Sequence, residues 1–119
     1  MYKDISIAVL ITCHNRIDKT LECLRHLYNR TNTENFNFEV YLVDDGSTDG
    51  TSQSIMEIFP LVNIINGNGN LYWNQGMRLA WKTAIKKNNY NFYIWLNDDT
   101  IIDEDSISHL FECYYENLK

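Results

Sequence analysis

The stretch EVYLVDDGSTDGT, residues 39–51, joins an apolar run directly to a polar turn and the start of a helix. Residues 39–43 are mostly apolar rather than alternating, as in a strand of a parallel sheet that is covered on both faces. The Asp, Gly, Ser and Thr residues that follow favour turns, and Asp49 is a typical residue just before a helix. This stretch therefore predicts a strand and a helix joined by a short polar loop.

The same alternation runs through the rest of the chain. Four β-rich runs are predicted as strands, namely Ile5–Thr12, Glu39–Val43, Val62–Ile65 and Phe92–Leu96. Apolar residues recur at helical spacing in four groups: Ile17, Leu21, Leu24 and Leu27 or Tyr28; Ile55, Ile58 and Phe59; Met77, Trp81, Ala84 and Ile85; Ile107, Leu110, Phe111 and Tyr114. Further helix signals are Asn15 with Asp18, Asp103 with Ser106, and Pro60 as a stop. The order β-α-β-α-β-α-β-α predicts an α/β, Rossmann-like fold with a mainly parallel sheet flanked by helices.

Composition limits the function classes. The chain has 119 residues, of which 45% are hydrophobic and 13% aromatic, so it predicts one folded domain or the front part of a larger one. Sixteen acidic and ten basic residues give a net charge of -6, which argues against nonspecific nucleic-acid binding and against a polybasic membrane-binding face. The three cysteines form no CxxC pair, which favours a reducing compartment over a disulfide framework. The first apolar run is too short for a secretory signal or a membrane span.

Polar residues gather at the ends of all four predicted strands. The segments are Thr12–Arg16, Asp44–Gly50, Asn66–Asn70 and Asn97–Thr100. In an open α/β sheet, ligands bind outside the carboxyl ends of the strands. A single polar strand end is explained by turn formation, but four at the same edge of a sheet predict a binding site.

Several simpler interpretations apply to the individual segments. Residues 44–50 could form only a turn and a helix cap, and His14 could be a capping side chain. A calcium loop starting at Asp45 is excluded because its twelfth position is Met56 rather than a bidentate Glu. Residues 66–70 lack the spacing and the lysine of a phosphate loop. The three tryptophans, Trp73, Trp81 and Trp95, fit a core or a pocket wall better than a base-stacking platform.

The adjacent acids Asp98 and Asp99 follow a run predicted to be a buried strand. Two neighbouring carboxylates repel each other unless a cation or hydrogen-bond donors neutralise them. Capping of the following helix explains one acid but not both. A hard divalent ion with oxygen ligands, Mg²⁺ or Mn²⁺, is therefore the expected partner, and such an ion usually brings a phosphate with it.

Taken together, three segments resemble family 2 glycosyltransferases of the GT-A fold. They are Thr12–Arg16 after the first strand, Val43–Thr51, and Trp95–Thr100, and their order and spacing match over essentially the whole chain. The loop Gly67–Asn74 resembles the rhamnosyltransferase-like branch. The resemblance implies that residues 1–119 are the nucleotide-diphospho-sugar-binding portion of a GT-A domain, and that this fold is incomplete here.

The resemblance also implies roles for individual residues. Thr12 and Asp45 would hold the nucleobase of a UDP- or dTDP-linked sugar, Asp98 would approach the ribose or diphosphate, and Asp99 would ligate the metal. His14, Asn15 and Asn74 are further candidate donor contacts. The motif Asp-Asp-Thr in place of Asp-x-Asp leaves open which of the two acids binds the metal. Trp73 stands where many relatives have Arg, so a phosphate contact is either missing or supplied elsewhere.

The family implies transfer of a sugar to a saccharide or lipid-linked acceptor hydroxyl in cell-surface polysaccharide synthesis. The expected location is the cytoplasm, with the inner face of the membrane as the place of any peripheral attachment. The catalytic base of inverting relatives lies on a later element, whereas only 19 residues follow Thr100 here. We therefore expect the base beyond residue 119, donor binding without efficient transfer, and self-association through exposed apolar or strand-edge surface. The alternatives are a truncated, non-catalytic nucleotide-sugar-binding module and a phosphoryl-accepting receiver-like domain; the latter needs a lone Asp after the third strand, where this chain has Asn66.

Overall fold

A computed structural model describes residues 5–31 and 36–118. In chain order the elements are β1 (Ile5–Cys13), α1 (Ile17–Arg30), β2 (Phe36–Asp44), α2 (Thr51–Ile58), β3 (Asn63–Asn66), α3 (Tyr72–Lys87), β4 (Phe92–Trp95) and α4 (Ser106–Glu116). The predicted alternation and the α/β class are confirmed. Within the described ranges, no helix is long and apolar enough to span a membrane.

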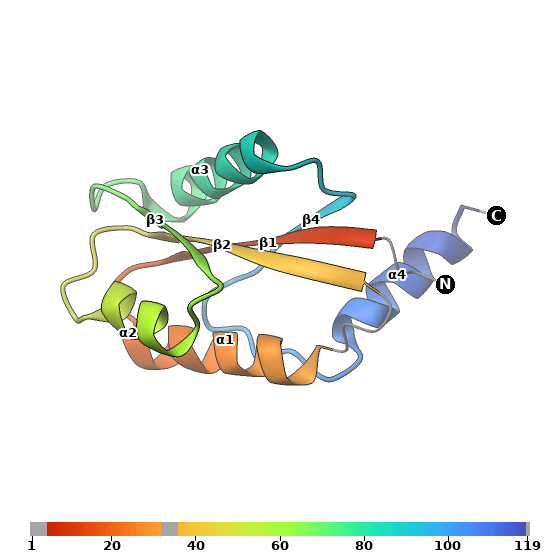
Figure 1. The fold of residues 1–119 in the computed structure, drawn as a ribbon, viewed down its shortest axis with the longest axis horizontal. Coiled ribbons are helices and arrows are strands. Elements are labelled where there is room, and N and C mark those ends of the chain that lie inside the picture. The colour runs from red at the N-terminus through yellow and green to blue at the C-terminus, as the bar shows by residue number, and fades with distance from the viewer. Residues whose placement is uncertain (1–4, 32–35, 119) are drawn as a thin grey trace.

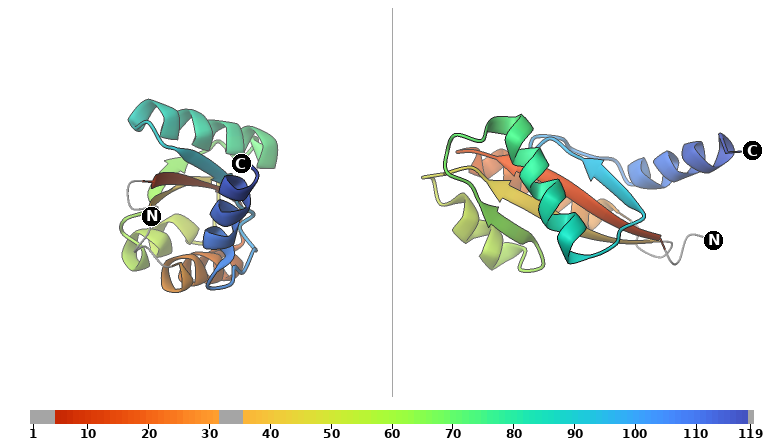
Figure 2. Two further views of the ribbon diagram at one scale, coloured as in Figure 1. Left: turned by 90° about the vertical axis from the view of Figure 1, so that its right-hand side faces the viewer. Right: turned by 90° about the horizontal axis from the view of Figure 1, so that it is seen from above.

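The four strands form one parallel sheet in the order β3-β2-β1-β4. β1 and β2 pair over their whole lengths, from Ile5 opposite Phe36 to Cys13 opposite Asp44. Helix α3 covers one face of the sheet, while α1 and α2 cover the other, and α4 lies near the amino ends of the strands (Figures 1 and 2). All four carboxyl ends therefore point to the same edge, as the sequence predicted.

The central strand β1 supplies side chains to both hydrophobic layers. Alternate residues such as Val9 and Ile11 pack toward α1, whereas Ala8 and Leu10 pack toward Met77 on α3. Since the strand is buried on both faces, its sequence is continuously apolar rather than alternating.

Two of the differences between the predicted and observed elements show how packing decides them. The second strand begins at Phe36 rather than Glu39, because Phe36 is fully buried and packs edge-on against Phe111 of α4. In α4 only Ile107 and Phe111 are buried, whereas the predicted core residues Leu110 and Tyr114 are 56% and 48% exposed. The described part of the chain therefore buries only a narrow face of this helix.

Helix starts also differ from the prediction. The residue before α1 is Arg16, and the side chain of Asn15 caps nothing there; its Oδ1 accepts the N–H of Thr48 at 2.7 Å. Asp49 does stand at the start of α2, where its carboxylate accepts from both the N–H and the hydroxyl of Thr51. Asp49 also accepts the N–H of Ile17, so one carboxylate ties two helix starts together.

Candidate functional site

A pocket of about 370 Å³ lies at the carboxyl edge of the sheet. It is lined by Thr12, Cys13, His14, Arg16, Asp45, Gly69, Tyr72, Trp73 and Asp98. The lining comes from the ends of β1, β2 and β4, from the loop between β3 and α3, and from the first residues of α3, so the convergence predicted from the four polar strand ends occurs. Of the predicted site residues, Thr12, His14, Asp45 and Asp98 line this pocket, whereas Asn15, Asn74 and Asp99 lie outside its lining.

Asp45 is the buried anchor of the loop that follows β3. Its Oδ1 accepts the N–H of Gly69 at 2.8 Å, and its Oδ2 accepts those of Leu71 and Tyr72 at 3.0 and 2.9 Å. Burial alone would raise the pKa of Asp45, but these three donors stabilise the carboxylate and hold the pKa below its usual value. A carboxylate offers about four acceptor positions, so one remains, on Oδ1. A contact from Asp45 to a nucleobase stays a prediction.

Two glycines let the loops at this edge touch through their backbones. Gly46 has a positive φ of 73°, and a Cβ there would come within 2.8 Å of the Cα of Gly69. A Cβ at Gly67 would meet the Asp45 carboxylate at 2.6 Å. Side chains at either position would therefore push the two loops apart and disturb the hydrogen bonds of Asp45.

Thr12 is pressed against the first turns of α3. The helix approaches so closely that a Cβ on Gly76 would lie 2.6 Å from the Thr12 hydroxyl oxygen. That oxygen is buried and has no hydrogen-bond partner within the described residues. A buried hydroxyl without a partner is uncommon, so Thr12, a lining residue of the pocket, leaves an unused polar group in the packing between β1 and α3.

His14 and Asn15 hold the loop after β2 in place. His14 Nδ1 lies 2.6 Å from the backbone oxygen of Asp45, and Asn15 binds the loop through its N–H to Ser47 Oγ at 2.8 Å. Asn15 adopts a left-handed φ of 49°, which Asn tolerates better than most residues. These contacts give Asn15 a structural role; its predicted contact with a donor is not tested by them.

Arg16 lies between the two adjacent acids. Its Nη1 is 3.4 Å from Asp98 Oδ1, and its Nη2 donates to Asp99 Oδ2 at 3.1 Å. Asp98 is buried and accepts from the Thr20 hydroxyl at 3.3 Å, whereas the Asp99 side chain is 46% exposed. Burial raises the pKa of Asp98, and the guanidinium only partly opposes this effect. A cation is therefore present beside the acids, as charge repulsion required, and it comes from the protein itself.

Three tryptophans form a chain of edge-on contacts beside the pocket. Trp95 on β4 contacts Trp73 and Trp81 of α3, with ring centroids 5.6 and 5.7 Å apart. Each indole residue is 40–46% exposed, so the cluster is a wall rather than a core. Trp73 lines the pocket, which confirms for this residue the expectation that it forms part of a pocket wall.

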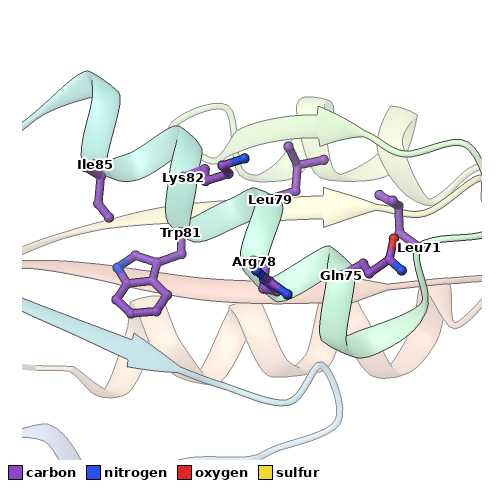
Figure 3. Close-up of a pocket in the computed structure, with 7 residues that line it drawn as sticks. All are labelled: Leu71, Gln75, Arg78, Leu79, Trp81, Lys82 and Ile85. Atoms are coloured by element: carbon purple, nitrogen blue, oxygen red, sulfur yellow. The ribbon is translucent and has the colours of Figure 1, made fainter.

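A larger cleft of about 560 Å³ runs along α3. Figure 3 shows its lining residues along α3, with Leu71 just before the helix and Trp81 reaching toward β4. The residues are Leu71, Gln75, Arg78, Leu79, Trp81, Lys82 and Ile85, which include no carboxylate. The smaller pocket is lined by Asp98, by Thr12 with its unpartnered hydroxyl and by the loop anchor Asp45, so we take it as the candidate site.

Three features of the site were missed from the sequence. The sequence predicts no role for Arg16, it does not distinguish Gly76 from other glycines in helices, and the N–H groups around Asp45 carry no residue signature. One local signal in the sequence could have indicated that α3 packs closely on the sheet: a glycine, Gly76, inside an amphipathic helix.

The sequence matches the family model described as Glycosyl transferase family 2 over residues 8–118. The poly-beta-1,6-N-acetyl-D-glucosamine synthase of Staphylococcus epidermidis is 27% identical over 118 residues, which cover 95% of this chain and 26% of that protein. An uncharacterized glycosyltransferase of Rickettsia bellii is 24% identical over 119 residues, with 97% of this chain and 16% of that protein covered. The chain thus spans about a quarter or less of the length of these curated relatives.

Solved structures share the fold. S. aureus TarS 1-349 in complex with UDP-GlcNAc has a TM-score of 0.76 and 21% identity, and the match covers 94% of this chain and 32% of that one. The mannosyltransferase PcManGT from Pyrobaculum calidifontis, in complex with GDP-Man and Mn²⁺, has a TM-score of 0.68 and 19% identity over 89% of this chain and 31% of that one. The likeness to both supports the incomplete GT-A architecture.

Proposed function

The chain belongs to glycosyl transferase family 2, and we propose that residues 1–119 are the part of a GT-A glycosyltransferase that binds the nucleotide-diphospho-sugar donor. The observation that carries the proposal is the pocket at the carboxyl edge of the sheet, where the ends of three strands and one loop meet. Ligands of open α/β sheets bind at this edge. A UDP- or dTDP-linked sugar is the donor class, and the names of the relatives make UDP-GlcNAc the first donor to test.

The nucleobase of the donor is proposed to bind on the side of the pocket where Thr12 and Asp45 lie. Thr12 offers a buried hydroxyl without a partner among the described residues, and Asp45 has one acceptor position left on Oδ1. A ring N–H that donates to Asp45 would use this position without displacing the loop. His14 and Asn74 are proposed as further contacts, and Asn15 as a residue that acts by holding the loop between β2 and α2.

The acids Asp98 and Asp99 are suited to a divalent ion. Mg²⁺ is usually held by one or two carboxylates and the phosphates of the substrate, so these two side chains would suffice. No group of three or more His, Cys, Asp or Glu side chains with metal-site geometry occurs in residues 5–31 and 36–118, which fits such a shared site. We propose Asp99, the more exposed acid, as the first ligand and Asp98 as the second. When bound, the ion would neutralise charge on the leaving diphosphate.

In the proposed reaction the acceptor hydroxyl attacks the anomeric carbon, and the bond from that carbon to the diphosphate oxygen breaks with its electron pair leaving on the nucleotide. The hydroxyl proton goes to a base. The acids of the α4 region are poor candidates, because Asp103, Glu104 and Asp105 line a different cleft together with Arg30 and His109. We propose a base outside residues 1–119 and an acceptor that is a saccharide or a lipid-linked saccharide.

Calorimetric titration of the purified chain with UDP, dTDP and GDP, with and without Mn²⁺, tests the proposal. We expect UDP or dTDP to bind, Mn²⁺ to tighten binding, and Asp99→Asn to remove the effect of Mn²⁺ while the fold persists. The exposed Asp103→Asn serves as the control. If no nucleoside diphosphate binds under any condition, the donor-binding function is wrong; if Asp99→Asn responds to Mn²⁺ as the parent does, the metal assignment is wrong.

A further inference from the structure

Arg16 lines the candidate pocket, but the proposed function gives it no role. It stands directly before α1, and its side chain is 42% exposed. Among the side chains that line this pocket, it is the one with a permanent positive charge. Both of its terminal nitrogens face carboxylates, Nη1 toward Asp98 and Nη2 toward Asp99.

The charges around Arg16 do not suit a diphosphate as they stand. Two carboxylates and one guanidinium leave a local charge of about -1, which would repel an anionic diphosphate. A divalent cation on the acids reverses that balance. It also competes with the guanidinium for the same oxygens, because both Asp98 and Asp99 are partners of Arg16.

We propose that Arg16 changes partners when the donor binds. In the free protein its guanidinium neutralises Asp98 and Asp99 and so occupies the place of the metal. When a divalent ion takes over the two carboxylates, the guanidinium is released to bind the donor's diphosphate. Arg16 thus supplies the phosphate contact that Trp73 does not. This inference rests on the proposed donor-binding function.

The geometry of the side chain favours such an exchange. A guanidinium presents a planar fork of donors that fits carboxylate and phosphate oxygens equally well. The pair with Asp99 is half-exposed, and exposed ion pairs are weak, so separating it costs little. The buried Asp98 keeps its hydrogen bond from Thr20 when the guanidinium leaves.

The exchange predicts effects of opposite sign for one substitution. Arg16→Gln removes a competing charge from the acids, so Mn²⁺ alone should bind about two- to fivefold more tightly. The same change removes a charge-assisted phosphate contact, so UDP in the presence of Mn²⁺ should bind about tenfold or more weakly. UMP, which lacks the second phosphate, should lose less than UDP. Arg16→Lys should fall between parent and Arg16→Gln, because it keeps the charge but not the fork.

The experiment is calorimetric titration of the 119-residue chain and its variants with Mn²⁺ alone, and with UDP or UMP at saturating Mn²⁺. Arg25→Gln is the matched control, since Arg25 lies on α1, the helix that Arg16 directly precedes, pairs with Glu22, and does not line the pocket. Thermal unfolding followed by circular dichroism verifies that each variant is folded.

Tighter Mn²⁺ binding together with weaker UDP binding in Arg16→Gln supports the exchange. If Arg16→Gln weakens the binding of both ligands, or changes neither, the exchange is overturned and Arg16 has a structural role. The proposed function still stands in that case as long as the parent chain binds UDP. A parent that binds neither Mn²⁺ nor UDP overturns both.

Discussion

Replacing Asp45 by Asn probes how the pocket is held together. The two side chains have nearly the same shape, but Asn has one acceptor oxygen and an amide group that donates. With its oxygen in the place of Oδ2, Asn can keep the N–H groups of Leu71 and Tyr72, and its NH₂ group then faces the N–H of Gly69. One charge-assisted bond is lost, at about 1.5–3 kcal/mol, and two become neutral bonds. We expect the free energy of unfolding to fall by about 2–4 kcal/mol at pH 7.

Urea unfolding followed by far-UV circular dichroism measures this loss, which corresponds to a melting temperature lowered by roughly 8–16 °C. The pH dependence gives a second test. Because the folded protein holds the pKa of Asp45 below its unfolded value of about 3.9, the carboxylate stabilises the fold above that pH. Its contribution is lost as the pH falls through the folded value, so the difference between parent and variant should shrink below about pH 4.

Hydrogen exchange locates the effect. The amides of Gly69, Leu71 and Tyr72 should exchange faster in Asp45→Asn than in the parent. Amides in the centre of β1 should still exchange only through global unfolding of the chain. Asp103→Asn, whose side chain is 93% exposed, is the control and should leave stability unchanged. Equal stability of parent and Asp45→Asn at pH 7 would refute the role of Asp45 as the anchor of this loop.

Three further outcomes are expected. Gly76→Ala should destabilise the fold by about 1–3 kcal/mol, because the added Cβ meets Thr12. In urea unfolding, Thr12→Ala should relieve much of that loss in the double variant, whereas strictly additive losses would contradict the contact. Cys113 is exposed, whereas burial raises the pKa of Cys13 and brings the pKa of Cys23 to about 12. A disulfide reagent at pH 8 should therefore modify one thiol rapidly in the folded chain and all three thiols only after unfolding. The 119-residue chain should bind donor without transferring sugar at ordinary enzyme rates, and turnover on any supplied acceptor would show that the base lies within it.

The strand and helix order could be predicted from the sequence because each strand is a mostly apolar run and each helix carries an apolar stripe. Only β1 and β2 contain fully buried residues, however; β3 and the strand before Asp98, β4, are partly exposed, so the expectation of a buried strand there is wrong. The boundaries were harder. Phe36 and Phe38 are separated from the apolar run of β2 by polar neighbours, so the start of the strand depends on packing against α4 that no local pattern contains. The exposure of Leu110 shows the same limit, since an amphipathic stripe does not tell how much of it finds a partner.

The location of the site could be predicted for a topological reason. Parallel strands bring all their carboxyl ends to one edge, so four polar segments far apart in sequence had to meet there. The partners of each side chain could not be predicted. Asp45 binds backbone groups 24 to 27 residues further along the chain, and Arg16 reaches acids 82 and 83 positions away. Such pairings depend on loop conformation rather than on the type of residue.

The tryptophan cluster makes the protein's ultraviolet emission a local signal. All three indoles of the chain belong to it, and one of them lines the candidate pocket. Energy absorbed by one ring can pass to its neighbours at these separations, so a ligand that quenches Trp73 should dim the whole emission. The same closeness should give a coupled far-ultraviolet dichroism band of the indole rings that weakens when Trp95 is replaced by Phe. Intrinsic fluorescence would therefore follow events at one edge of the sheet and say little about the core that β1 and β2 build.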